Sequence, residues 1–163
     1  MADRFEALVA QASAVGEALR ARDETVVVVD GSTGGLLAAA LIAVPGASEF
    51  MVGGVVMYTL PASRAWLQGA LEQPEGMRGA TEQFAIWQAE SARSKVDATW
   101  GLSETGATGP TGNRYGDPAG HSWAGVSGPV ERTQHTLTGK DDRVANMFVF
   151  AASALGLLQA AFS

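Results

Sequence analysis

The fold of this chain is decided by the stretch Val26-Val27-Val28-Val29-Asp30-Gly31-Ser32-Thr33-Gly34-Gly35-Leu36-Leu37. Consecutive valines lead into two hydroxyl side chains and a cluster of glycines, and a Leu/Ala pattern typical of a helix follows. This order predicts a strand buried on both faces, a tight turn and the N-terminus of a helix. Backbone N–H groups at such a turn lie at the positive end of the helix dipole. We therefore expect residues 30–35 to form the floor of an anion-binding pocket.

Strand and helix patterns alternate along the rest of the chain. Predicted strands span residues 25–29, 51–58, 98–102, 121–126 and 131–137. Predicted helices span residues 4–21, 36–44, a short segment after Pro61, 82–95 and 141–161. The alternation predicts a single α/β domain over residues 1–163, with three layers (α/β/α) and a mixed, mainly parallel five-stranded sheet. The final hairpin makes one strand antiparallel. The tryptophans are expected in the core: Trp66, Trp87, Trp100 and Trp123.

Composition restricts the classes of function. Hydrophobic residues make up 47% of the chain and charged residues 17%, which excludes a disordered protein. The formal net charge of −6, without a Lys/Arg cluster, disfavours nucleic acid as a partner. Cysteine is absent, and His121 and His135 are not spaced as metal ligands, so these histidines are expected to be structural or exposed. The N-terminus lacks an apolar signal core. We expect a cytoplasmic protein without a metal or cofactor.

Residues 144–162 form the most apolar segment and contain no charged residue. Their length approaches that of a membrane span, but many of them are small, and neither flanking aromatics nor a basic anchor at the far end supports one. We expect no membrane insertion and a helix that packs on the sheet or in a subunit interface. Small residues would allow close packing in a homo-oligomer: Ala151, Ala152, Ala154 and Gly156.

A second glycine-rich stretch, Thr105-Gly106-Ala107-Thr108-Gly109-Pro110, lies in the segment 103–120, which is predicted to be a long irregular loop. If the strands that precede the two stretches are parallel neighbours, both stretches emerge at the same edge of the sheet. They would then enclose a site lined by N–H and hydroxyl groups. The alternative is a structural turn built from positive-φ glycines. The predicted ligand-binding residues are Asp30, Gly31, Ser32, Thr33, Gly34, Gly35, Tyr58, Thr105, Gly106, Thr108 and Gly109.

The candidate catalytic groups are Ser32 and Tyr58. The Ser32 hydroxyl is a candidate nucleophile, and the Tyr58 side chain could share a proton or stack on a ring. Helix capping by Ser32 and packing by Tyr58 are the alternatives. Asp30 and Glu104 could each act as a general base or bind a ribose hydroxyl, or serve the helix dipole alone. Neither the P-loop nor the G-x-G-x-x-G fingerprint is present.

The order of these motifs resembles the CinA C-terminal-domain family. The resemblance covers nearly the whole chain and depends on the ordered set of motifs. The matching segments are residues 30–36, 45–48, 53–58, 105–112 and 118–120. The resemblance implies the family's activity, which is that of a nicotinamide-nucleotide amidohydrolase that deamidates nicotinamide mononucleotide.

The active-site motif of this chain departs from the family pattern. Active members usually have Glu-Ser-Cys-Thr-Gly-Gly with the serine as nucleophile, and matching places Gly31 at the serine and Ser32 at the cysteine. Active members also carry a lysine shortly after the tyrosine, where Ser63 or Arg64 falls nearest in this chain. An arginine keeps its proton and cannot replace a lysine base. The segment 140–143 also matches the family's arginines poorly.

Three hypotheses follow for the function. The first is an amidohydrolase-like protein whose catalysis is lost or altered, and the second is a non-catalytic protein that binds a nucleotide-like or phosphate ligand. The third is a structural subunit of a homo-oligomer. The sequence leaves open whether the chain is an enzyme.

Overall fold

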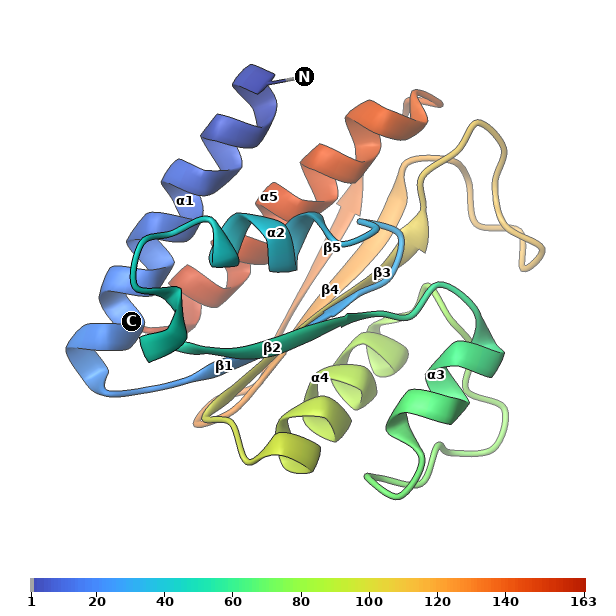
Figure 1. The fold of residues 1–163 in the computed structure, drawn as a ribbon. Helices are drawn as coiled ribbons and strands as arrows, with labels where there is room; N and C mark the ends of the chain where they lie inside the picture. Colours follow the sequence, from blue (N-terminus) through green and yellow to red (C-terminus); the bar gives the residue numbers. More distant parts are fainter. Residues whose placement is uncertain (1) are drawn as a thin grey trace.

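A five-stranded sheet lies between two layers of helices in the computed structural model, which describes residues 2–163 (Figure 1). The strands are β1 (Val26–Asp30), β2 (Met51–Val56), β3 (Trp100–Ala107), β4 (His121–Ser127) and β5 (Arg132–Leu137), in the spatial order β2-β1-β3-β4-β5. β1 pairs in parallel with both β2 and β3, whereas β4 pairs antiparallel with β3 and β5. The predicted mixed sheet and its antiparallel strand are therefore confirmed.

The valines of β1 are buried because helices cover both faces of the sheet. Helices α1 (Ala2–Arg22), α2 (Leu36–Ile42) and α5 (Arg143–Ala161) cover one face, and α3 (Leu60–Leu67) and α4 (Glu82–Val96) cover the other (Figure 1). A 3-10 turn, η1 (Ala47–Glu49), precedes β2. Successive strand side chains point to opposite faces. Val26 and Val28 accordingly join the core on the α1/α2/α5 side, while Val27 and Val29 join the core on the α3/α4 side.

Helix α5 is part of the core of its layer. Its side chains Phe150, Leu155 and Leu158 are buried, which confirms that the helix packs inside the domain. Of the four small residues predicted to allow close packing in a homo-oligomer, Ala151 and Ala154 are fully buried within the chain, and Ala152 and Gly156 are partly buried. Gln11 of α1 donates to the Ala152 carbonyl (2.9 Å). By length and composition alone α5 also meets the criteria for a membrane span.

The segment 103–120 is more regular than predicted. β3 continues to Ala107 and pairs with the whole of β4, so Thr105 and Gly106 lie in a strand. The prediction of an irregular segment is wrong for residues 103–107, because the glycine at position 106 belongs to a paired strand. A Cβ at Gly106 would clash with the His121 carbonyl of β4, so glycine is needed there for close strand approach.

Two tryptophans also differ from the prediction. Trp66 is 58% exposed, because the short helix α3 buries Ser63 and Leu67 and leaves Trp66 outside that face. Trp123 is only partly buried and stacks on His135, with 4.8 Å between the ring centroids. Trp87 and Trp100 are buried, as predicted.

Gly101 allows α4 to lie directly on β3. A Cβ at Gly101 would overlap the Ala89 carbonyl of α4, whereas a Cβ at Gly53 of β2 would meet nothing within 4 Å. We expect Gly101→Ala to lower the free energy of unfolding by about 1–3 kcal/mol, because overpacking moves a helix away from its sheet. Gly53→Ala is the matched control and should change it by less than about 0.5 kcal/mol. Urea unfolding measures both, and equal stabilities of the two variants would contradict this account of the packing.

Candidate functional site

The turn after β1 is held by the carboxylate of Asp30. This fully buried group accepts hydrogen bonds from the Thr33 hydroxyl (2.6 Å) and from the N–H groups of Leu37 (3.0 Å) and Ala38 (3.1 Å). The two N–H groups belong to the first turn of α2, so Asp30 acts as its cap. Burial raises the pKa of Asp30, and these hydrogen bonds oppose that rise.

A second buried carboxylate, Glu104 of β3, binds the other side of the same turn. Its Oε1 atom accepts from the hydroxyls of Ser32 (2.7 Å) and Ser122 (2.6 Å), and its Oε2 atom accepts from the N–H of Thr33 (2.9 Å). Burial raises the pKa of Glu104, with the hydrogen bonds from Ser122 and Ser32 acting in the opposite direction. The N–H groups of Thr33, Leu37 and Ala38 are thus already bonded to carboxylates of the protein, rather than free to hold a ligand anion.

A pocket of about 350 Å³ opens beside this turn at the carboxyl ends of β1 and β3. The two predicted stretches do meet there, because β1 and β3 are parallel neighbours. The lining residues come from the β1 turn, the β2–α3 connection, the start of α4, β3 and the loop after β3. They are Gly31, Ser32, Met57, Tyr58, Thr59, Leu60, Pro61, Ser63, Gly79, Ala80, Phe84, Thr105, Gly106, Asn113, Arg114 and Tyr115.

The predicted site residues therefore divide into two groups. Those that line the pocket are Gly31, Ser32, Tyr58, Thr105 and Gly106. Those that lie outside its lining are Asp30, Thr33, Gly34, Gly35, Thr108 and Gly109. In this second group, Asp30 and Thr33 hold the turn, and the carbonyl of Thr108 accepts from the Asn146 amide (2.8 Å).

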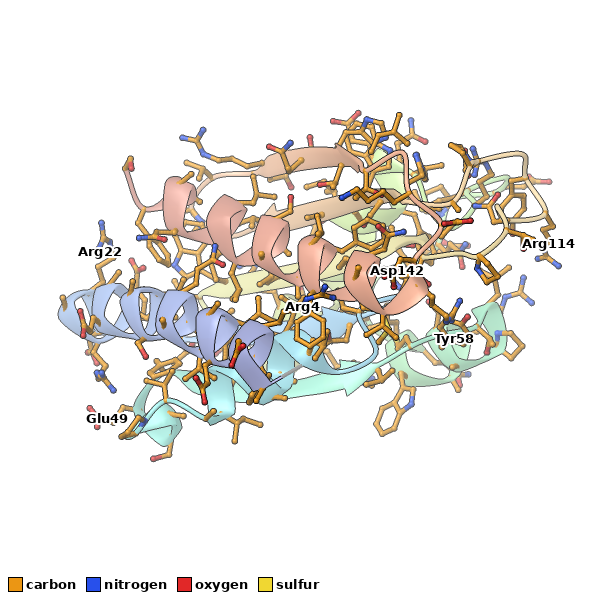
Figure 2. The ribbon with its side chains drawn as sticks, turned by 90° about the horizontal axis from the view of Figure 1, so that it is seen from above. Arg4, Arg22, Glu49, Tyr58, Arg114 and Asp142 are labelled. Atoms are coloured by element: carbon orange, nitrogen blue, oxygen red, sulfur yellow. The ribbon has the colours of Figure 1, made fainter. Side chains whose placement is uncertain are left out.

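Sequence reasoning missed the wall formed by residues 113–115. Arg114 and Tyr115 of this loop line the pocket, and Arg114 Nη2 donates to the Tyr115 hydroxyl (3.0 Å). Figure 2 shows Arg114 toward the same end of the molecule as Tyr58. The sequence signal that would have indicated this wall is a cation next to an aromatic ring inside a glycine-rich loop.

An ion pair holds the loop of residues 108–120 against the segment that connects α3 to α4. Arg78 Nη1 lies 2.6 Å from Asp117 Oδ2, and the Arg78 guanidinium stacks over the Tyr115 ring at 4.9 Å. The hydrogen bond from Arg78 lowers the pKa of Asp117. Asn113 adds a further hydrogen bond to Asp117 (2.8 Å), so the two pocket-lining residues Arg114 and Tyr115 sit on an anchored loop.

Arg143, at the start of α5, reaches the rim of the pocket. Its guanidinium donates to the carbonyl of Gly109 (2.6 Å) and to the Tyr58 hydroxyl (2.7 Å). In sequence, residues 140–143 match the family's arginines poorly. The fold nevertheless brings one arginine from this segment to the tyrosine that lines the site.

Neither the serine nor the lysine of the family's catalytic pair is present at the corresponding positions of this chain. At Gly31 a Cβ would overlap the backbone carbonyl oxygen of Glu104, so this backbone has no room for a serine. Near the expected lysine, Ser63 lines the pocket and is 1% exposed, and its hydroxyl has no hydrogen-bond partner among residues 2–163. Arg64 lines a neighbouring hollow instead.

The two histidines lie next to each other, which their separate strands had not suggested. His121 Nδ1 and His135 Nε2 are 3.0 Å apart, and the Nε2 atom of His121 donates to the carbonyl of Ala80 (2.9 Å). The pair sits behind the pocket, since Ala80 is a lining residue. Within residues 2–163, no group of three or more His, Asp or Glu side chains is arranged to hold a metal ion.

Comparison with known proteins places these observations in a family. The model of the CinA C-terminal domain matches residues 9–162. A CinA-like protein of Salinibacter ruber is 37% identical over 142 residues, which is 86% of this chain and 34% of that protein. A CinA-like protein of Myxococcus xanthus is 37% identical over 147 residues, or 88% and 34% of the two chains. This chain thus spans about a third of the length of these curated relatives.

Solved structures have the same fold. A CinA superfamily protein from Klebsiella pneumoniae has a TM-score of 0.87 at 26% identity, covering 95% of this chain and 97% of that one. The competence/damage-inducible protein CihA from Agrobacterium tumefaciens has a TM-score of 0.82 at 26% identity, covering 94% of each chain. The residues that the family model matches include all five strands, the β1 turn and the residues that line the pocket. The chain therefore belongs to the CinA C-terminal domain family.

Proposed function

We propose that this chain binds a small anionic, nucleotide-like ligand in the pocket beside the β1 turn, without the serine–lysine amide hydrolysis of the family. The loss of hydrolysis is supported by Gly31, which stands where the family has its nucleophilic serine. A Cβ at this position would overlap the Glu104 carbonyl. Restoring a serine would require the turn to move away from β3. The pocket itself remains open, and the hydroxyl-bearing residues Ser32, Ser63 and Thr105 are part of its mainly apolar lining.

The chemistry of the lining favours a ligand with a ring and a negative charge. Tyr58 and Tyr115 contribute aromatic rings to the lining, and Arg114 supplies positive charge there in a protein whose net charge is −6. The Arg143 guanidinium lies over the Tyr58 ring, 5.9 Å from its centroid. The hydroxyls of Ser63 and Thr105 offer hydrogen bonds to sugar or phosphate oxygens.

The binding proposal predicts a separation of binding from turnover. Calorimetry with nicotinamide mononucleotide should show binding, while an ammonia assay at high protein concentration should show no release. Arg114→Gln should weaken binding by about tenfold, because it removes a charge-assisted contact. Arg64→Gln, an exposed arginine outside this lining, is the matched control and should bind like the wild type. Absence of binding heat for pyridine nucleotides would overturn the ligand class, and ammonia release would overturn the loss of hydrolysis.

A second candidate function rests on the contact between Ser32 and Glu104. The Ser32 hydroxyl lines the pocket and donates to the buried Glu104 carboxylate at 2.7 Å. A carboxylate whose pKa is raised by burial is a stronger base than an exposed one. In this scheme the Ser32 oxygen attacks an acyl carbon and Glu104 takes its proton. Glu104 then returns the proton to the leaving group, and water releases the acyl group from Ser32.

The second candidate is tested with an activated ester as probe and mass spectrometry as readout. Acylation of Ser32 should appear in the wild type, be absent in Ser32→Ala and be slowed by at least about 100-fold in Glu104→Gln. Ser122→Ala is the matched control, because Ser122 donates to the same Glu104 oxygen (2.6 Å) but does not line the pocket. A wild-type chain without adduct would exclude this chemistry and leave binding as the function.

Glu104 also predicts a pH dependence of stability. Because burial raises its pKa in the folded state, the folded chain binds a proton at pH values where the unfolded chain has lost it. The stability from Glu104 is thus full below the unfolded-state pKa and is lost as pH rises through the folded-state pKa. We expect the free energy of unfolding of the wild type, measured relative to that of Glu104→Gln, to fall as pH rises from acid toward neutral. Urea unfolding across pH checks this, with exposed Glu75→Gln as control. Equal slopes for wild type and Glu104→Gln would contradict it.

A further inference from the structure

The two edges of the sheet differ in their protection. β5, at one edge, has the sequence Arg-Thr-Gln-His-Thr-Leu and carries charge and polar groups. β2, at the other, reads Met-Val-Gly-Gly-Val-Val, and its Val52 and Val56 are 46% and 48% exposed. Exposed edge strands of monomeric proteins are usually guarded by charges, prolines or bulges against pairing with another chain. β2 has no charge or proline, and its one register irregularity lies at its first residues.

The free edge of β2 presents hydrogen-bonding groups at alternate residues. The N–H of Met57 donates to the carbonyl of Asp30 in β1 (2.9 Å), so the backbone N–H and C=O groups of Met57 point toward β1. Backbone groups alternate along a strand. The N–H and C=O groups of Gly54 and Val56, and the C=O of Val52, therefore point away from β1.

The sequence of β2 and its flanks is nearly palindromic. Residues 50–58 read Phe-Met-Val-Gly-Gly-Val-Val-Met-Tyr, with Gly54 at the centre. An antiparallel pair of these strands centred on Gly54 places Val52 of each copy opposite Val56 of the other. Both valines belong to the residues that bond outward, so this register satisfies the free backbone groups and joins exposed apolar side chains on one face.

We propose that β2 pairs antiparallel with β2 of a second copy of this chain, centred on Gly54, and joins the two sheets into one. A two-fold axis at Gly54 makes the contact self-complementary, as a closed dimer requires. This proposal concerns the β2 edge and does not depend on the ligand pocket. It differs from an interface on α5, where Ala151 and Ala154 are buried within the chain and Gln11 of α1 donates to the Ala152 carbonyl.

Charge also favours a second copy as the occupant. Two chains of net charge −6 repel each other, but residues 50–63 contain no charged side chain, so the copies can meet at this edge without like charges in contact. Glu49 lies at the opposite end of the molecule from Tyr58, which follows β2 (Figure 2). Antiparallel pairing thus brings Glu49 of each copy toward the α3 end of the other, where Arg64 is exposed.

The test is the oligomeric state of charge variants. Sedimentation should show a dimer for the wild type, and Val56→Lys should raise the dimer dissociation constant by at least about 100-fold, because two-fold symmetry places two new charges in the contact. Leu137→Lys is the matched control: Leu137 is a 58% exposed apolar residue of β5 at the other edge, and this variant should remain dimeric. Both substituted side chains are exposed, so folding should be preserved, which circular dichroism checks.

Hydrogen exchange distinguishes this contact from any other dimer. The amides of Gly54 and Val56 should be protected in the wild type and in Leu137→Lys, and should exchange rapidly in Val56→Lys. A wild type that sediments as a monomer at about 100 μM would overturn the proposal, because standard-sized interfaces hold more tightly than that. A dimer that survives Val56→Lys, or leaves the Gly54 amide exchanging freely, would place the interface elsewhere and overturn it too.

Discussion

The hydrogen bonds to the buried Glu104 carboxylate hold the candidate site together. One side chain from β3 binds the hydroxyl of Ser32 and the N–H of Thr33 in the β1 turn, and the hydroxyl of Ser122 in β4. A carboxylate without such donors would be strongly destabilising in a site closed to water, so the three partners must stay in place together. The turn, the central strand and the antiparallel strand are thereby fixed relative to one another.

This constraint explains why the glycines of the turn have different roles. Gly31 lies so close to the Glu104 carbonyl that no Cβ fits, while Gly34 and Gly35 take positive φ values that lead the chain into α2. Asp30 then caps α2 through the N–H groups of Leu37 and Ala38. Two protein carboxylates thus occupy the N–H groups that an external anion would use, and the open volume lies beside the turn, between Ser32 and the Tyr58 and Tyr115 side chains.

Much of the layout followed from local patterns. The β-branched run at residues 26–29 predicted a strand buried on both faces, and the alternation of strands and helices predicted three layers, because both depend on periodicity along the chain. The extent of β3 and the exposure of Trp66 did not follow. The glycines of β3 are needed because β4 and α4 lie close to them, and the sequence around a glycine does not reveal such a contact. Helix α3 has only about two turns, which is too short for its apolar residues to define a clear buried face.

The sequence by itself determined the architecture and the family, and it predicted that the two glycine-rich stretches meet at the carboxyl ends of β1 and β3. Only the tertiary structure decided what each site residue does there. It directed Ser32 and Thr33 to Glu104, brought Arg143 from residues far along the chain to Tyr58, and put the Arg114–Tyr115 loop across the pocket. The physical reason is that local propensity is set by neighbours in sequence, whereas hydrogen-bond partners and burial are set by neighbours in space, which only the packed sheet defines.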